Sequence, residues 1–65
     1  MPDRFVVIRV DSQPTWFAGY TEDGKTRVSI HYTEAKEMTE AEAQRAKYDL
    51  QIERRGVWSV RRVLL

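Results

Sequence analysis

Cysteine is absent from this 65-residue sequence, and histidine occurs only once. A chain without thiols forms no disulfide framework and offers no thiolate to a metal ion, so its fold rests on a hydrophobic core. A single domain of this length, covering residues 1–65, buries only about 60% of the surface that its unfolded chain exposes, which keeps its stability small. The composition fits a reducing compartment, and we expect neither a metal ion nor another cofactor.

Long apolar runs are also missing, because no uninterrupted apolar stretch exceeds a few residues. A transmembrane helix needs roughly 20 consecutive apolar residues. The N-terminal residues do not resemble a signal peptide. We therefore expect a soluble, cytoplasmic protein without a membrane partner.

The sequence has little of the chemistry that enzymes use. None of its serines lies in the glycine spacing of a nucleophile elbow, and His31 falls in an alternating, strand-like stretch. The three glycines are isolated, so no phosphate-binding loop is present. His31 with Glu34 makes one loose pair, where a metal site needs several convergent ligands. We expect that the protein is not an enzyme and has no catalytic residues.

Short strand-like segments make up the first half of the chain. Three are expected, over residues 4–10, 15–21 and 26–32. The Asp23–Gly24 dipeptide predicts a tight hairpin between the second and third segments, since such turns need positive φ. The alternation of the third segment places three apolar side chains on its core face: Val28, Ile30 and Tyr32.

One long helix is expected over residues 39–55. Thr39 and Glu42 have the spacing of a capping box, in which each side chain satisfies a backbone N–H group of the first turn. Met38, just before the cap, occupies the position of a hydrophobic staple. Gly56 can adopt the left-handed conformation that ends a helix.

Residues 57–65 read as a final strand with Trp58, Val60 and Leu64 on one face. The resulting order predicts an α+β fold: a small, mainly antiparallel four-stranded sheet (β-β-β-α-β) with one helix packed on one face. We expect the last strand to pair beside the first, because that arrangement buries the most apolar strand between neighbours.

The helical period divides the apolar residues of the helix into two stripes on nearly opposite sides. One consists of Ala43, Ala46 and Leu50, which we assign to the core because small alanines allow a close approach to the sheet. The other, here called the outer stripe, consists of Ala41, Tyr48 and Ile52. Two interpretations of the outer stripe are open: contact with a partner, including a second copy of the chain, or a peripheral core position.

Charge is distributed unevenly along the chain, although the net charge is only +1. The middle of the chain is acidic, and its side chains could mimic phosphates and compete for a basic groove of a partner. These acidic candidates are Glu34, Glu37, Glu40, Glu42 and Asp49. A simpler explanation is that acids stabilise a helix N-terminus.

The C-terminal residues 54–65 carry four arginines and no acid. An alternative site, for nucleic acid, would combine basic and aromatic side chains on the sheet face away from the helix. Its candidates are Arg9, Arg27, Arg61, Arg62 and Phe17. The sequence pI of about 8.1 is low for a committed nucleic-acid domain, and these arginines could instead keep an edge-rich sheet soluble.

The order of these features resembles that of small, uncharacterised accessory proteins of bacteriophages and prophages. The resemblance covers nearly the whole chain and rests on the Val-Val-Ile-Arg-Val strand, the Glu-Asp-Gly-Lys hairpin and the junction Ala35-Lys36-Glu37-Met38-Thr39-Glu40-Ala41-Glu42-Ala43. It implies a phage-type protein of the class that includes anti-CRISPR and other host-defence inhibitors, which would act in the host cell cytoplasm. It assigns no functional residue.

We therefore expect a non-enzymatic protein that binds and inhibits or redirects a host protein or ribonucleoprotein complex. The alternatives are a small nucleic-acid-binding protein and a self-associating structural or virion-associated protein.

Overall fold

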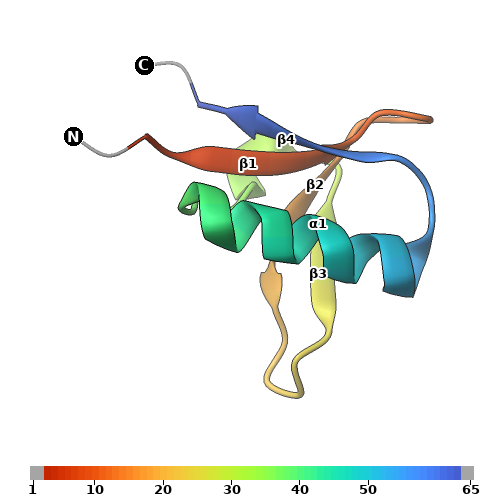
Figure 1. Ribbon diagram of the computed structural model, residues 1–65. Coiled ribbons are helices and arrows are strands. Elements are labelled where there is room, and N and C mark those ends of the chain that lie inside the picture. Colours follow the sequence, from red (N-terminus) through yellow and green to blue (C-terminus); the bar gives the residue numbers. More distant parts are fainter. Residues whose placement is uncertain (1–2, 64–65) are drawn as a thin grey trace.

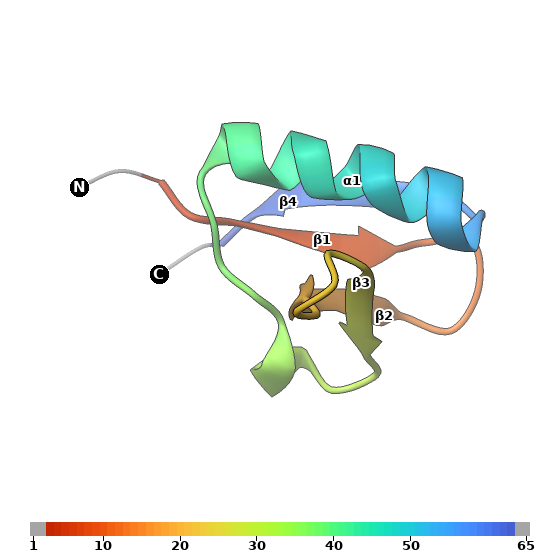
Figure 2. The same ribbon diagram turned by 90° about the horizontal axis from the view of Figure 1, so that it is seen from below.

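The fold contains the four expected strands and the expected helix in the expected order, with one further 3-10 turn, in a computed structural model that describes residues 3–63. They are β1 (Phe5–Arg9), β2 (Thr15–Tyr20), β3 (Thr26–Ser29), the 3-10 turn η1 (Tyr32–Glu34), α1 (Glu40–Arg54) and β4 (Trp58–Arg62). The strands form one antiparallel sheet in the order β3-β2-β1-β4, and α1 lies across one face of it (Figures 1 and 2). The α+β prediction is confirmed, as is the position of β4 beside β1. The expectation for Leu64 lies outside the described residues.

Both ends of α1 are set by local sequence. At its start, the capping box is formed: the Thr39 hydroxyl accepts a hydrogen bond from the Glu42 N–H (3.2 Å), and the Glu42 carboxylate accepts one from the Thr39 N–H (3.0 Å). Hydrogen bonds from the Thr39 backbone and hydroxyl lower the pKa of Glu42 below its ordinary value. At its end, Arg55 (φ 57°) and Gly56 (φ 86°) reverse the chain toward the sheet. The positive φ of Gly56 favours glycine, because other residues rarely adopt this conformation.

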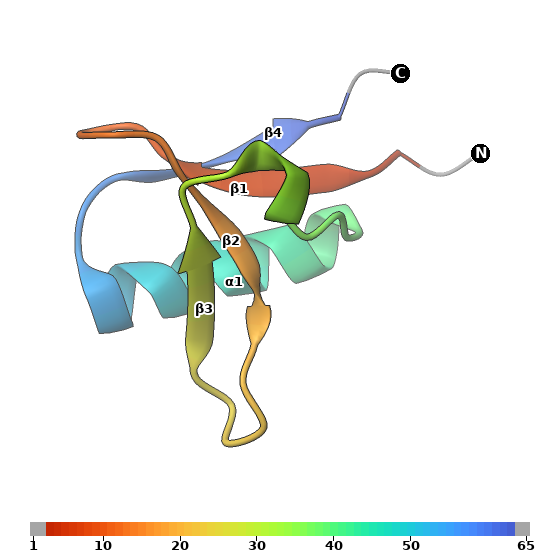
Figure 3. The ribbon, with the colours of Figure 1, turned by 180° about the vertical axis from the view of Figure 1, so that it is seen from behind.

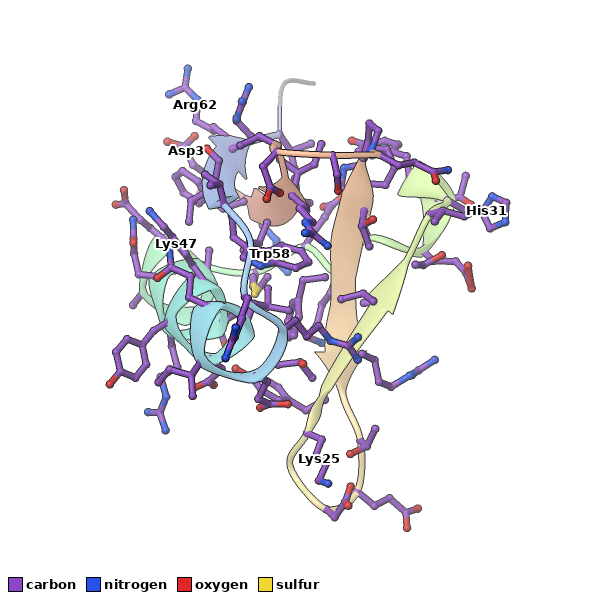
Figure 4. All side chains as sticks on the ribbon, turned by 90° about the vertical axis from the view of Figure 1, so that its right-hand side faces the viewer. Asp3, Lys25, His31, Lys47, Trp58 and Arg62 are labelled. Atoms are coloured by element: carbon purple, nitrogen blue, oxygen red, sulfur yellow. The ribbon has the colours of Figure 1, made fainter. Side chains whose placement is uncertain are left out.

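The core lies between α1 and the sheet. Its buried apolar side chains are Val7, Phe17, Met38, Ala43, Ala46, Leu50 and Trp58. Trp58 projects from β4 into the space under the helix (Figure 4), and its indole N–H donates to the carbonyl oxygen of Arg55 at 2.7 Å. The core assignments of Ala43, Ala46 and Leu50 are confirmed, since all three have no exposed surface.

β1 and β2 pair over only part of their length, which leaves a gap between them in the sheet. β1 and β2 pair only at Ile8–Trp16 and Arg9–Thr15, and beyond these pairs β2 and β3 run away from β1 and β4 (Figure 3). The connection before α1 occupies the opening, because Met38 exchanges two backbone hydrogen bonds with Phe5 (2.8 and 2.9 Å). Met38 is 3% exposed and lies in the same core cluster as Ala43, four residues after the cap, as a hydrophobic staple predicts. Its backbone pairing with Phe5 fixes where α1 begins.

The third strand is shorter than the sequence predicts. β3 ends at Ser29, and Ile30 and Tyr32 are 55% and 54% exposed, so their assignment to a core face is wrong. The Ser29 hydroxyl accepts from the His31 N–H (3.1 Å) and donates to Glu34 (2.6 Å). Such a local bond competes with the strand ladder and turns the chain into η1.

We expect the two faces of α1 to respond differently to truncation. Leu50→Ala should lower the free energy of unfolding by about 2–5 kcal/mol, because it removes a fully buried side chain and leaves a cavity. Ile52→Ala, two residues along and 63% exposed, should change it by less than about 0.5 kcal/mol. Urea titrations followed by circular dichroism measure both, and similar losses in the two variants would contradict this packing.

Candidate partner-binding surfaces

The outer stripe lies on the side of α1 that faces away from the sheet. Tyr48 is 61% exposed and Ile52 is 63% exposed, and Ala41, two turns before Tyr48, is exposed as well. The peripheral-core interpretation of this stripe is therefore wrong. A large aromatic and a large aliphatic side chain stand next to each other on a regular helix, one turn apart, with Arg45 on the same side.

A shallow hollow adjoins the N-terminal end of the outer stripe. It is lined by Tyr20, Lys36, Ala41, Glu42 and Arg45, and has a volume of about 380 Å³. Ala41 belongs to both the hollow and the stripe, so the two form one continuous surface. Its lining combines apolar side-chain surface with charged groups of both signs, a composition that suits a protein partner.

Tyr20 ties the β2–β3 hairpin to the helix beside this hollow. Its hydroxyl donates to Oδ2 of Asp49 at 2.6 Å, and Nε of Arg45 lies 3.8 Å from the same oxygen. Desolvation, followed by the hydrogen bond to Asp49, raises the pKa of Tyr20 to about 12. Asp49 therefore serves first as an internal acceptor that positions the hairpin.

The five acidic candidates do not form one cluster. Glu34 lies on η1, on the side of the sheet opposite to α1 (Figure 2), and accepts a hydrogen bond from Ser29. Glu42 is held in the capping box and Asp49 by Tyr20. The remaining two candidates, Glu37 and Glu40, are exposed and lie just before α1 and at its first residue.

The residues of the nucleic-acid alternative are divided between two faces, contrary to the prediction. Phe17 is fully buried in the core and cannot stack on a base. Arg9 and Arg62 oppose Trp58 and Phe5 in the sheet, which places both on the helix side. Arg27 and Arg61 lie on the far face. The physical reason is the strand period: Val7 of β1 is buried under the helix, so Arg9, two residues along, points to the same side.

An aromatic pair that the sequence did not identify lies on this far face. Trp16 contacts Tyr32 edge to face, with ring centroids 5.6 Å apart and an interplanar angle of 70°. Trp16 follows from the same alternation, since it precedes the buried Phe17 and must point the other way. Tyr32 could not be placed from sequence, because η1 interrupts the strand pattern.

Within residues 3–63, histidine, aspartate and glutamate side chains form no group of three or more that could hold a metal ion. No helix in this part of the chain has the length and apolar character needed to cross a membrane. Comparison with known protein families, with characterised proteins and with solved structures gave no match.

The Tyr20–Asp49 hydrogen bond predicts a pH dependence of stability. Because the pKa of Tyr20 is about 12 in the folded state and about 10 when unfolded, the unfolded state releases this proton first. The contribution of Tyr20 is present below about pH 10 and is lost as pH rises to about 12. Between about pH 10 and about pH 12 the free energy of unfolding should fall less in Tyr20→Phe than in the wild type. Urea midpoints at the two pH values measure this difference. Equal losses would show that the hydroxyl is not coupled to folding.

Proposed function

We propose that this chain is a non-enzymatic, phage-type accessory protein. In this proposal it binds a host protein or ribonucleoprotein complex and inhibits or redirects it, as anti-CRISPR and other anti-defence proteins do. The observation that carries the proposal is the exposure of Tyr48 and Ile52 side by side on α1. Binding hot spots are enriched in aromatic residues that become buried at the centre of an interface.

Rigidity of the helix supports this role. The side of α1 opposite the outer stripe is fixed in the core by Ala43, Ala46 and Leu50, and its N-terminus is held by the capping box. A backbone that is already ordered loses little freedom when it binds, so less of the binding free energy is spent on ordering it.

The two ends of α1 carry opposite charges, which limits how a partner can be oriented on this surface. Glu37 and Glu40 are exposed at the N-terminal end of α1, and Arg54 and Arg55 lie at the opposite end. A partner with a basic patch next to an apolar depression would match the N-terminal end, and such patches are common on proteins that bind nucleic acid. Glu37 and Glu40 would then take the place of backbone phosphates.

Placing negative charge on the apolar outer stripe tests the proposal. Tagged wild-type protein, the double variant Tyr48→Asp/Ile52→Asp and the control Gln51→Asp are used to capture proteins from a host lysate, with identification by mass spectrometry. A partner held by wild type and control should be lost with the double variant, and its Kd, measured with purified protein, should rise by at least about tenfold. Circular dichroism checks that all three proteins are folded.

Two results would contradict the proposal. Capture that is unchanged in the double variant would remove the outer stripe as the binding surface. A wild-type mass of two chains in analytical ultracentrifugation, reduced to one chain in the double variant, would instead favour the self-association alternative.

The Trp16–Tyr32 pair favours nucleic-acid binding as the second candidate. Tyr32 is 54% exposed. Ser29 pairs with Trp16, so Arg27, two residues before Ser29 on β3, lies on the same face as Trp16. Exposed aromatic rings next to a cation can stack on bases of a single strand.

This candidate predicts that the chain binds a fluorescent single-stranded oligonucleotide and that binding weakens steeply as salt is raised, because phosphate contacts release counterions. Arg27→Glu should weaken binding by about tenfold or more at low salt, and Arg45→Glu, on the helix, should change it far less. Flat titrations at low salt would exclude this function.

A further inference from the structure

The two edges of the sheet are treated differently by the fold. At the β3 edge, side chains from the end of α1 cover the backbone of Thr26. Glu53 accepts hydrogen bonds from the Thr26 N–H and hydroxyl, both at 3.2 Å, and Arg54 donates to the Thr26 carbonyl oxygen at 3.0 Å. These bonds occupy the edge-facing groups of Thr26, at the start of β3, with which another strand would pair.

The β4 edge has no such cover among the described residues. At the two ends of the β1–β4 ladder, Val10 N–H donates to Val57 O (2.9 Å) and Val63 N–H donates to Arg4 O (2.8 Å). In an antiparallel pair, every second residue bonds to the neighbouring strand, so Ser59 and Arg61 bond to β1. The N–H and C=O groups of the alternate residues, Trp58, Val60 and Arg62, therefore point away from the sheet.

Positive charge surrounds this open edge. Arg61 and Arg62 are exposed, and no acidic residue occurs between Arg54 and the C-terminal end of the described chain. Two carboxylates lie near its ends. Asp11, at the Val57 end, is paired with Arg9 at 2.7 Å, and Asp3, at the other end, lies 3.6 Å from Arg62 in a pair whose side chains are both more than half exposed. Figure 4 shows Asp3 and Arg62 together at the outer margin of β4. An exposed pair of this kind contributes little and is readily exchanged.

We propose that β4 is a strand-addition site for an extended, acidic segment of a partner protein. The backbone groups of Trp58, Val60 and Arg62 would pair with this segment, and its carboxylates would lie beside Arg61, on the face of the sheet away from α1. Arg62, on the helix side, adds to the positive charge of the edge. The same charges act against a second copy, because pairing two β4 strands would bring four arginines to one short edge. The site is separate from the outer stripe, so it does not depend on the function proposed above.

A designed peptide serves as the probe for the unidentified segment. In Val-Glu-Val-Glu-Val-Glu-Val, the alternation places all three carboxylates on one face of the added strand. On addition to isotope-labelled protein, we expect amide hydrogen exchange of Trp58, Val60 and Arg62 to slow by about tenfold or more. Binding should weaken as salt is raised, and the same peptide with lysine in place of glutamate should not bind.

Two variants at one position separate the backbone contribution from the charge. The N–H of Arg62 points away from the sheet, so Arg62→Pro removes a donor at the edge without removing a hydrogen bond of the ladder. Arg62→Ala removes the charge and keeps the donor. We expect Arg62→Ala to weaken peptide binding a few-fold and Arg62→Pro to abolish it.

If Arg62→Pro does not fold, Arg61→Glu replaces it as the test, because it should reverse the preference from the glutamate to the lysine peptide. Undiminished binding to Arg62→Pro, exchange protection confined to α1, or no binding of the glutamate peptide would each overturn the proposal. A peptide-free dimer with Trp58, Val60 and Arg62 already protected would also overturn it, by assigning the edge to a second copy.

Discussion

Contact between one narrow face of α1 and the sheet is the constraint on which the rest of the structure depends. Ala43 and Ala46 bring the helix backbone close to β1 and β4, and Leu50 fills the space beside Trp58 and Phe17. A chain of this size has room for only one such layer of buried side chains. Every other element serves to place the helix over it: the capping box at one end, the reversal at Gly56 at the other, and the backbone pairing of Met38 with Phe5.

The surfaces proposed for binding are a consequence of this single-layer core. Because one face of α1 is sufficient for the core, the opposite face remains exposed with Tyr48 and Ile52 on it. The C-terminal end of α1 reaches β3 and covers the backbone of Thr26 at that edge through Glu53 and Arg54, whereas β4 follows the helix and forms the other edge of the sheet. A small domain with a single helix can cover one edge in this way but not both, and the uncovered strand is the one that carries the arginines.

Predictions from the sequence were correct where a pattern specifies local geometry. They were wrong where the sequence was equally compatible with burial of either face of a strand. The helix, its capping box and its buried stripe were predicted correctly, because the 3.6-residue period and the cap chemistry depend on neighbours along the chain. The sides of Phe17 and Arg9 were predicted wrongly. Strands with apolar residues on both faces do not specify which face is buried, so a shift of one residue exchanges the two. The end of β3 was missed because Ser29 forms side-chain bonds to His31 and Glu34 that alternation does not anticipate.

By itself, the sequence determined the element order, the antiparallel hairpin at Gly24, the limits of α1 and the division of its apolar residues into two stripes, since each depends on contacts within a few residues. Only the tertiary structure decided that Trp16 meets Tyr32 on the far face, that Asp49 and Glu53 are acceptors for the hairpin strands, and that β4 is left as an open edge. These outcomes join segments that are distant in the chain. They depend on strand register and on the position of the helix over the sheet, which no local pattern encodes.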